Sequence, residues 1–296
     1  MSIKIEVLWG PEPEGKFITL PLASGRFQKI LFDRSLPKVL IVGEGKNFTF
    51  TAAFVALRRS FENVITTTWP VLSPDWSEVV KTALSNAHRN QEFLAKSDLY
   101  DTTSFTVEEV YTRYGSIFGV SPSTGPTYIG NVNATELEEH DNIIHSHCEN
   151  IFFQCPHDGQ SGTQHLIVSF MSSAARVQKA GNYLFLGITK DGRYSNVYGL
   201  RELIETSAPN IGYRLEGVDD ITIQKILHFG YRHQARRDED DIHDRILAHH
   251  VTLVFHREDS SSSPVNANDL SDEFASRLNI REPQRRTGIE YSDDEG

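Results

Sequence analysis

The chain has 296 residues, 39% of them hydrophobic, so it is long enough to bury a substantial core. Its formal net charge is −11, and residues 258–296, with ten acidic residues and four arginines, contribute −6 of this. This balance excludes a general, non-specific binder of nucleic acid, because phosphate contacts require lysine and arginine. A function directed at RNA would need a local basic face or a partner protein.

Membrane, secretory and disulfide-rich classes are also disfavoured. No stretch approaches the ~20 apolar residues of a membrane span, and the N-terminus lacks the apolar block of a secretory signal. Two cysteines, Cys148 and Cys155, give no disulfide framework, so a reducing, intracellular setting is expected. The spacing of His145, His147 and Cys148 fits no standard zinc pattern, so no metal site is predicted.

The first predicted elements are strands at residues 3–9 and 16–22, separated by a segment dense in glycine and proline. This pattern predicts a β-hairpin, which we assign to an N-terminal extension over residues 1–32. Further strands are expected at 38–42, 63–68, 128–132, 149–154, 183–189, 213–218 and 251–255. Helices are expected at 48–60, 75–94, 104–110, 164–179 and 198–206.

The alternation of strands and helices predicts one α/β domain over residues 33–257. We expect a mainly parallel sheet with helices on both faces, and an antiparallel edge formed by the last two strands. Residues 115–126 are expected to form a loop. Residues 258–296 contain few apolar residues and a run of serines, which predicts an acidic disordered tail and a candidate contact for a protein partner.

A glycine turn, Gly43-Glu44-Gly45, follows the first strand of this domain and predicts a nucleotide-type binding site. Glycine lets a ligand approach the backbone, and the following helix offers free N–H groups. A dinucleotide site favours a third glycine where this chain has Phe48, and no phosphate-binding Gly-Lys-Ser/Thr follows. The turn is therefore compatible with S-adenosylmethionine and argues against NAD or FAD. A purely structural turn stays an alternative.

Residues 39–50 resemble the opening of the 25S ribosomal RNA (uridine-N3)-methyltransferase-like family. Four later motifs follow in the family's order, at residues 66–68, 131–137, 150–157 and 230–231, so the resemblance covers roughly residues 38–257. It implies a Rossmann-like methyltransferase fold, S-adenosylmethionine as the methyl donor and an RNA uridine, in ribosomal RNA, as the acceptor. It also implies a nuclear or nucleolar location, with the cytoplasm as an alternative.

The resemblance assigns candidate cofactor contacts, with Glu44 placed to meet the methionine amino group. They are Gly43, Glu44, Gly45, Phe48, Asn133 and Ala134. The alternative for Glu44 is a solvated turn residue, and for Asn133 a turn at the end of a strand.

Candidate catalytic residues follow the fourth strand of the domain. His157 would accept the proton of uridine N3, and Gln154 would hydrogen-bond the edge of the base. The alternative for His157 is a helix cap or a loop contact. The candidate RNA contacts are Pro156, Tyr231, Arg236 and Arg237, with Tyr231 as a stacking platform. The two arginines can instead pair with the acidic residues at 238–241.

The chain departs from the family pattern at several places. Lys46 is an extra residue, Asn133 replaces an aspartate, and Gln154-Cys155 replaces Asn-Phe. An acid that would hold ribose hydroxyls is expected after the second strand, where this chain has Thr68-Trp69-Pro70; the nearest acid is Asp75. These departures keep open a second hypothesis, a degenerate methyltransferase-fold protein that serves as a binding or scaffold module.

Overall fold

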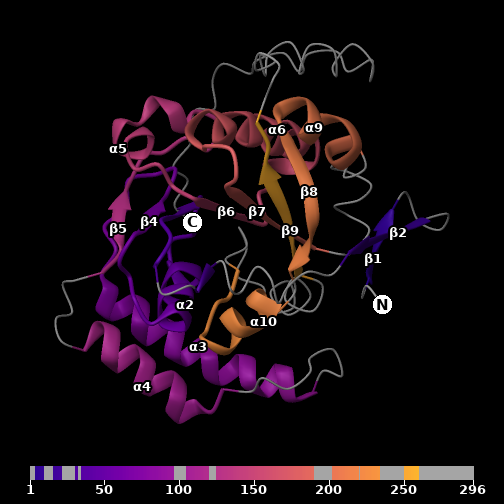
Figure 1. The fold of residues 1–296 in the computed structure, drawn as a ribbon. Helices are drawn as coiled ribbons and strands as arrows, with labels where there is room; N and C mark the ends of the chain where they lie inside the picture. The colour runs from indigo at the N-terminus through magenta and orange to yellow at the C-terminus, as the bar shows by residue number, and fades with distance from the viewer. Residues whose placement is uncertain are drawn as a thin grey trace, which may run out of the picture.

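The computed structural model describes residues 4–9, 16–21, 31–32, 35–96, 105–119, 125–189, 202–219, 221–233 and 250–259. These segments form two sheets, with helices on both sides of the larger one (Figure 1). Arg236, Arg237 and nearly all of the expected tail lie outside the described residues.

The larger sheet has seven strands in the order β5-β4-β3-β6-β7-β9-β8. Their bounds are β3 (Val39–Val42), β4 (Val64–Thr67), β5 (Thr127–Ile129), β6 (Asn150–Gln154), β7 (Tyr183–Thr189), β8 (Tyr213–Asp219) and β9 (His250–Arg257). Strands β3 to β7 pair in parallel, and β9 is antiparallel to both β7 and β8. The mainly parallel sheet is confirmed. The antiparallel edge expected from the last two strands is confirmed, with β9 next to β7 and β8 outermost.

The N-terminal hairpin is confirmed. Strands β1 (Lys4–Trp9) and β2 (Lys16–Pro21) pair antiparallel in a separate two-stranded sheet. Figure 1 shows this hairpin beside the β8 edge of the main sheet.

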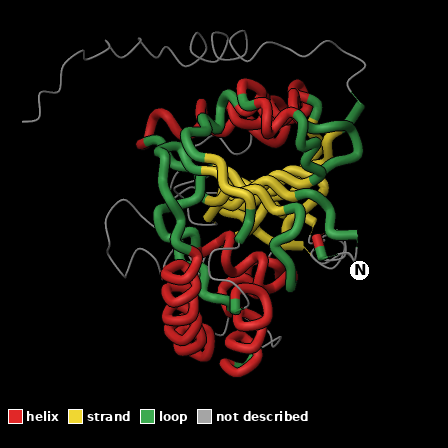
Figure 2. The backbone as a smooth tube through the Cα atoms, turned by 90° about the vertical axis from the view of Figure 1, so that its left-hand side faces the viewer, coloured by secondary structure: helices red, strands yellow, loops and turns green. Residues whose placement is uncertain are grey.

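Strand β3 shows why helices must cover both faces of the sheet. All four of its residues are buried, and they alternate between two apolar clusters. Leu40 and Val42 belong to one cluster, whereas Val39 and Ile41 belong to the other. Because successive side chains point to opposite faces of a strand, an unbroken apolar run requires cover on both faces. Figure 2 shows helices above and below the sheet.

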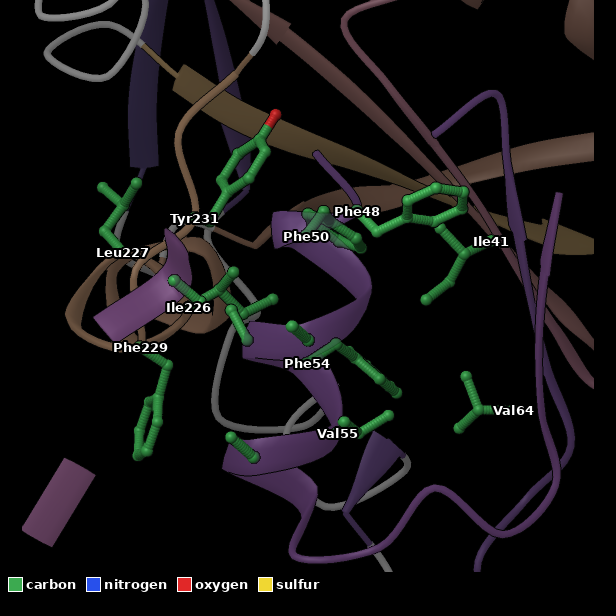
Figure 3. Packing of buried hydrophobic residues seen from close by; sticks show 14 of the residues in the cluster. Ile41, Phe48, Phe50, Phe54, Val55, Val64, Ile226, Leu227, Phe229 and Tyr231 are labelled. Atoms are coloured by element: carbon green, nitrogen blue, oxygen red, sulfur yellow. The ribbon is translucent and has the colours of Figure 1, made fainter. Parts of the chain in front are cut away.

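Four longer helices cover the face of Val39 and Ile41. They are α2 (Thr49–Arg58), α3 (Trp76–Lys96), α4 (Val107–Phe118) and α10 (Ile221–His228). Figure 3 shows side chains of α2 and of the α10 region meeting in this cluster, among them Phe54 and Ile226.

The opposite face is covered mainly by α6 (Gly159–Val177). Short helical segments lie with it: η1 (Leu137–Glu139), α5 (Asp141–Ile144), η2 (Leu203–Ser207) and α9 (Ala208–Ile211). No helix in the described part of the chain is long and apolar enough to span a membrane.

Several helix boundaries differ from those predicted. Helix α4 begins with a capping box between Thr106 and Glu109. It continues to Phe118, so the first four residues of the loop expected at 115–126 are helical. Gly115 lies within this helix at an exposed position, where a side chain would meet no other group. Helix α6 begins at Gly159, five residues before the predicted start, and α10 was not predicted.

Candidate functional site

A pocket opens at the carboxyl ends of β3 and β6, where the strand order reverses. Strands β4 and β5 lie on one side of β3, and β6 and β7 lie on the other. Ligand crevices of open α/β sheets form at such switch points. The pocket has an empty volume of about 420 Å³, part of it open to solvent. Its lining consists of Ile41, Val42, Gly43, Glu44, Gly45, Asn47, Phe50, Gln154, Tyr231, Arg232 and His233.

Gly43 forms the floor of the turn in a conformation that requires glycine. Its φ is +69°, and a Cβ there would lie 2.6 Å from Cε2 of Phe153. The next residue ties the turn to β4, because the Glu44 N–H donates to the Thr67 carbonyl at 2.9 Å. The backbone of the turn is therefore fixed by contacts with both neighbouring strands, β4 and β6.

The Glu44 carboxylate lies in the pocket and also caps helix α2. Its Oε1 accepts a hydrogen bond from the N–H of Thr51, in the first turn of the helix. The N-cap residue Phe48 makes no side-chain hydrogen bond to the start of the helix. Glu44, seven residues before Thr51, supplies that cap instead. Burial raises the pKa of the Glu44 carboxyl to about 7, although hydrogen bonds from Thr51 and Gly45 act to lower it.

The segment 230–233 closes another side of the pocket and is held by two helices. The Arg232 carbonyl accepts from the Thr49 hydroxyl at 3.2 Å. From α3, the Asn90 amide donates to the carbonyls of Leu227 (2.8 Å) and Tyr231 (2.9 Å). The Tyr231 ring packs edge-on against Phe50, with centroids 5.1 Å apart. In Figure 3 the Tyr231 hydroxyl points away from Phe54 and Phe229.

The polar side chains of this segment bond to one another and to α3. The Tyr231 hydroxyl lies 3.1 Å from His233 Nδ1, and the buried Arg232 guanidinium donates to Asn90 Oδ1 at 3.4 Å. Together with Glu44, two residues with basic side chains, Arg232 and His233, therefore line the pocket.

Five of the candidate residues from the sequence come together here: Gly43, Glu44, Gly45, Gln154 and Tyr231. Phe48, Asn133, Ala134, Pro156 and His157 are not among the lining residues. Phe48 is buried instead against Trp76 and Tyr128, at centroid distances of 5.8 and 5.7 Å.

Asn133 and His157 have contacts of their own. Asn133 Oδ1 accepts from the N–H of Thr135 at 3.1 Å, and its amide donates to Glu136 at 2.7 Å, as in a turn at a strand end. His157 is exposed ahead of α6, with Nδ1 3.5 Å from the Thr163 hydroxyl.

The position expected to carry a ribose-binding acid is buried and neutral. Thr68 has no exposed surface, and its hydroxyl lies 2.9 Å from the Tyr128 hydroxyl and 2.5 Å from the Pro70 carbonyl. Asp75 accepts instead from the N–H groups of Ser77 and Glu78, where it begins α3. Neither Thr68 nor Asp75 lines the pocket.

Sequence reasoning missed four polar or aromatic lining residues: Asn47, Phe50, Arg232 and His233. Arg232 and His233 directly follow the Gly230-Tyr231 motif, which was a usable signal. Asn47 and Phe50 lie within residues 39–50, the stretch that resembles the family's opening, which was also a usable signal. Among the described residues, no group of three or more His, Cys, Asp or Glu side chains could hold a metal ion.

The strand order, the glycine turn and the switch-point pocket define a Rossmann-like methyltransferase fold. The family described as "rRNA (uridine-N3-)-methyltransferase BTM5-like" matches residues 40–235, two thirds of the chain. The chain belongs to this family. No curated protein matches it.

Similar solved structures include an rRNA methylase from Streptococcus thermophilus, at 9% identity over 79% of this chain and 94% of that one, with a TM-score of 0.35. TrmN from Thermus thermophilus aligns at 12% identity over 83% and 57% of the two chains, with a TM-score of 0.34. A TehB-like SAM-dependent methyltransferase from Corynebacterium glutamicum aligns at 11% identity over 78% and 87%, with a TM-score of 0.33. Because these TM-scores are below 0.5, the fold assignment rests on the strand order and the family.

Proposed function

We propose that the chain binds S-adenosylmethionine in the switch-point pocket and methylates a uridine of ribosomal RNA at N3. One observation carries the proposal: in a member of this family, the Gly43-Glu44-Gly45 turn and Gln154 line one pocket. The catalytic domain is proposed to span residues 33–257. The proposed place of action is the nucleolus, where ribosomal RNA is made, with the cytoplasm as the alternative.

The charges in the pocket fit the methionine end of the cofactor. That end is a zwitterion, and Glu44 and Arg232 both line the pocket. The Glu44 carboxyl would bind its ammonium, and the Arg232 guanidinium would bind its carboxylate. Gly43 leaves the backbone open to close approach. The nucleoside end would be held without a carboxylate at the end of β4, because Thr68 stands there. We propose that the backbone of Asn133 and Ala134 contacts the nucleoside end of the cofactor. Phe48, which is buried, would act indirectly by supporting the glycine turn.

When bound, S-adenosylmethionine supplies a methyl group on a sulfonium, which a nitrogen nucleophile takes up with release of S-adenosylhomocysteine. The residues of the chain would prepare that nitrogen. Uridine N3 must lose its proton to become a nucleophile, and a histidine is suited to accept it. His233 lines the pocket, whereas His157 lies ahead of α6 and outside the lining. We therefore propose two candidate bases, His233 within the pocket and His157 at its approach.

The RNA contacts are proposed to continue from the pocket to the surface. Tyr231 lines the pocket and has an aromatic face suited to a base. Pro156, which is buried, would support an RNA contact of the exposed His157 at the end of β6. Arg236 and Arg237 follow three and four residues after His233 and would supply phosphate contacts. A protein partner for the acidic tail is proposed on charge alone.

Titration calorimetry with S-adenosylmethionine and S-adenosylhomocysteine tests the cofactor proposal. We expect binding by the wild type and at least tenfold weaker binding by Gly45→Asp, because a carboxylate side chain would enter the turn that approaches the ligand. Gly115→Asp, at an exposed position on α4, is the matched control and should bind normally. Absence of binding by the wild type would refute the proposal. Binding without methyl transfer to total RNA would favour the scaffold alternative.

Single-turnover methylation of ribosomal RNA separates the two candidate bases. Removing a general base lowers the rate of the chemical step by roughly 10²–10⁴-fold. We expect His233→Ala to show such a loss with little change in cofactor affinity. His157→Ala should show a smaller loss if that histidine only contacts the RNA. The reverse order of effects would assign the proton transfer to His157, and wild-type rates for both variants would contradict a histidine base.

A further inference from the structure

Gly187 in β7 leaves a gap through which two side chains from different strands meet. Gln154 of β6 is in register with Gly187, and β9 pairs with the other side of β7. A Cβ at position 187 would lie 2.0 Å from Gln154 Oε1 and 3.0 Å from His250 Nε2. These two atoms are 3.0 Å apart, within hydrogen-bond distance. The missing side chain is therefore what allows Gln154 to reach His250 across β7.

This contact turns Oε1 of the Gln154 amide toward His250. Oε1 is the acceptor for His250 Nε2. The amide nitrogen of Gln154 is buried without a hydrogen-bond partner, and Gln154 lines the pocket. A buried donor without a partner is unfavourable, so the pocket is arranged for a ligand that supplies an acceptor there.

His250 is itself held in place by a second pocket residue. Its ring meets the Tyr231 ring edge-on, with centroids 6.4 Å apart and planes at 89°. His250 is 4% exposed. It therefore lies between the amide of Gln154 and the segment that closes the pocket.

We propose that His250 is a positioning residue, which holds the Gln154 amide with its N–H groups toward the substrate base and so selects uracil over cytosine. This inference rests on the proposed function. A uracil presents carbonyl acceptors on both sides of N3, whereas cytosine presents an amino donor at C4. An amide N–H donor pairs with the uracil carbonyl and opposes the cytosine amino group. With the amide reversed, the preference would be lost.

The side-chain pair can be tested without any ligand. The Gln154 side-chain amide gives ¹H–¹⁵N signals that are identified by their loss in Gln154→Leu. We expect His250→Leu to shift these signals, and Gly187→Ala to do the same by displacing Oε1. The matched controls are His256→Leu, at the far end of β9 beside Tyr183, and Gly115→Ala. Signals that stay in place in both His250→Leu and Gly187→Ala would overturn the pair.

The base preference is tested with S-adenosylmethionine and two probes, a uridine-only and a cytidine-only RNA oligonucleotide. We expect the wild type to methylate the uridine probe, and His250→Leu and Gln154→Leu each to lower that rate by roughly tenfold. The double variant should be no slower than either single variant, and His250→Asn, which keeps an N–H donor, should recover part of the rate.

Independent, multiplicative losses in the double variant would overturn the positioning role, and equal rates on both probes would overturn the selectivity. If the wild type methylates neither probe nor total RNA, the proposed function and the selectivity both fail. The amide signals of the ligand-free protein then still decide whether His250 orients Gln154.

Discussion

Glu44 shows how one residue can serve both the fold and the site. Its carboxylate accepts from Thr51 at the start of α2 while it lines the pocket. The Gly-Glu-Gly pattern was enough to predict the turn and to single out Glu44 as a candidate. The bond to Thr51 was not predictable, because it depends on Phe48 adopting a φ of 49°, which turns the chain back toward Glu44. A non-glycine residue in that conformation leaves no sequence signature.

The raised pKa of Glu44 predicts a pH-dependent stability in the ligand-free protein. Its folded-state pKa is about 7, against an ordinary value of 4.5, so between these values the folded protein holds a proton that the unfolded chain has lost. The free energy of unfolding should therefore fall as pH rises from about 4.5 to about 7, by at most about 3 kcal/mol, and then level off.

Urea unfolding of the wild type and Glu44→Gln at pH 4.5 to 8 measures this effect. Because glutamine cannot ionise, Glu44→Gln should gain stability relative to the wild type across that range. Glu139→Gln, at an exposed position in η1, controls for the loss of one charge. A difference between Glu44→Gln and the wild type that does not change with pH would contradict the prediction.

At the scale of elements, strands were predicted more accurately than the segment that closes the pocket. Buried apolar runs such as 39–42 and 183–189 gave strand bounds within a residue or so. The pocket wall at 230–233 depends instead on Asn90, which is 141 residues away from Tyr231 in the chain and lies within a helix. An asparagine in an amphipathic helix gives no signal of such a distant contact.

The fit of that segment also depends on a close approach that only the structure reveals. Gly230 has a φ of +88°, and a Cβ there would lie 1.8 Å from the Ala83 carbonyl of α3. The Gly-Tyr motif was therefore recognisable as a motif, but its physical reason is the contact between α3 and the end of α10. Helix α10 escaped prediction because its eight residues are short for a periodic pattern to be distinctive.

At the scale of the whole molecule, the described pocket depends on residues between Ile41 and His233, and the hairpin belongs to a separate sheet. The alternating pattern and ordered motifs of the sequence allowed the domain and its family to be predicted. The sequence could not show which of the last two strands, β8 or β9, is outermost. In the structure, β9 lies between β7 and β8 although it follows β8 in the chain. The domain boundaries at residues 33 and 257 stay a prediction from the sequence.

Two separate deletions, of residues 1–30 and of residues 260–296, test these boundaries. Each variant should unfold cooperatively with a midpoint within about 4 °C of the full chain, since a loss of about 1 kcal/mol shifts it by that much. Affinity for S-adenosylmethionine should be unchanged. Residues 260–296 carry eight acidic residues and four arginines, so their removal brings the formal charge from −11 to −7.

The second deletion should therefore strengthen RNA binding at low salt and leave it unchanged at high salt, where repulsion of phosphate is screened. Fluorescence anisotropy with a labelled RNA at two salt concentrations measures this. The full chain with those eight acids replaced by amides separates charge from length and should behave like the deletion. Loss of cooperative unfolding or of cofactor binding in either deletion would instead assign that terminal segment to the domain itself.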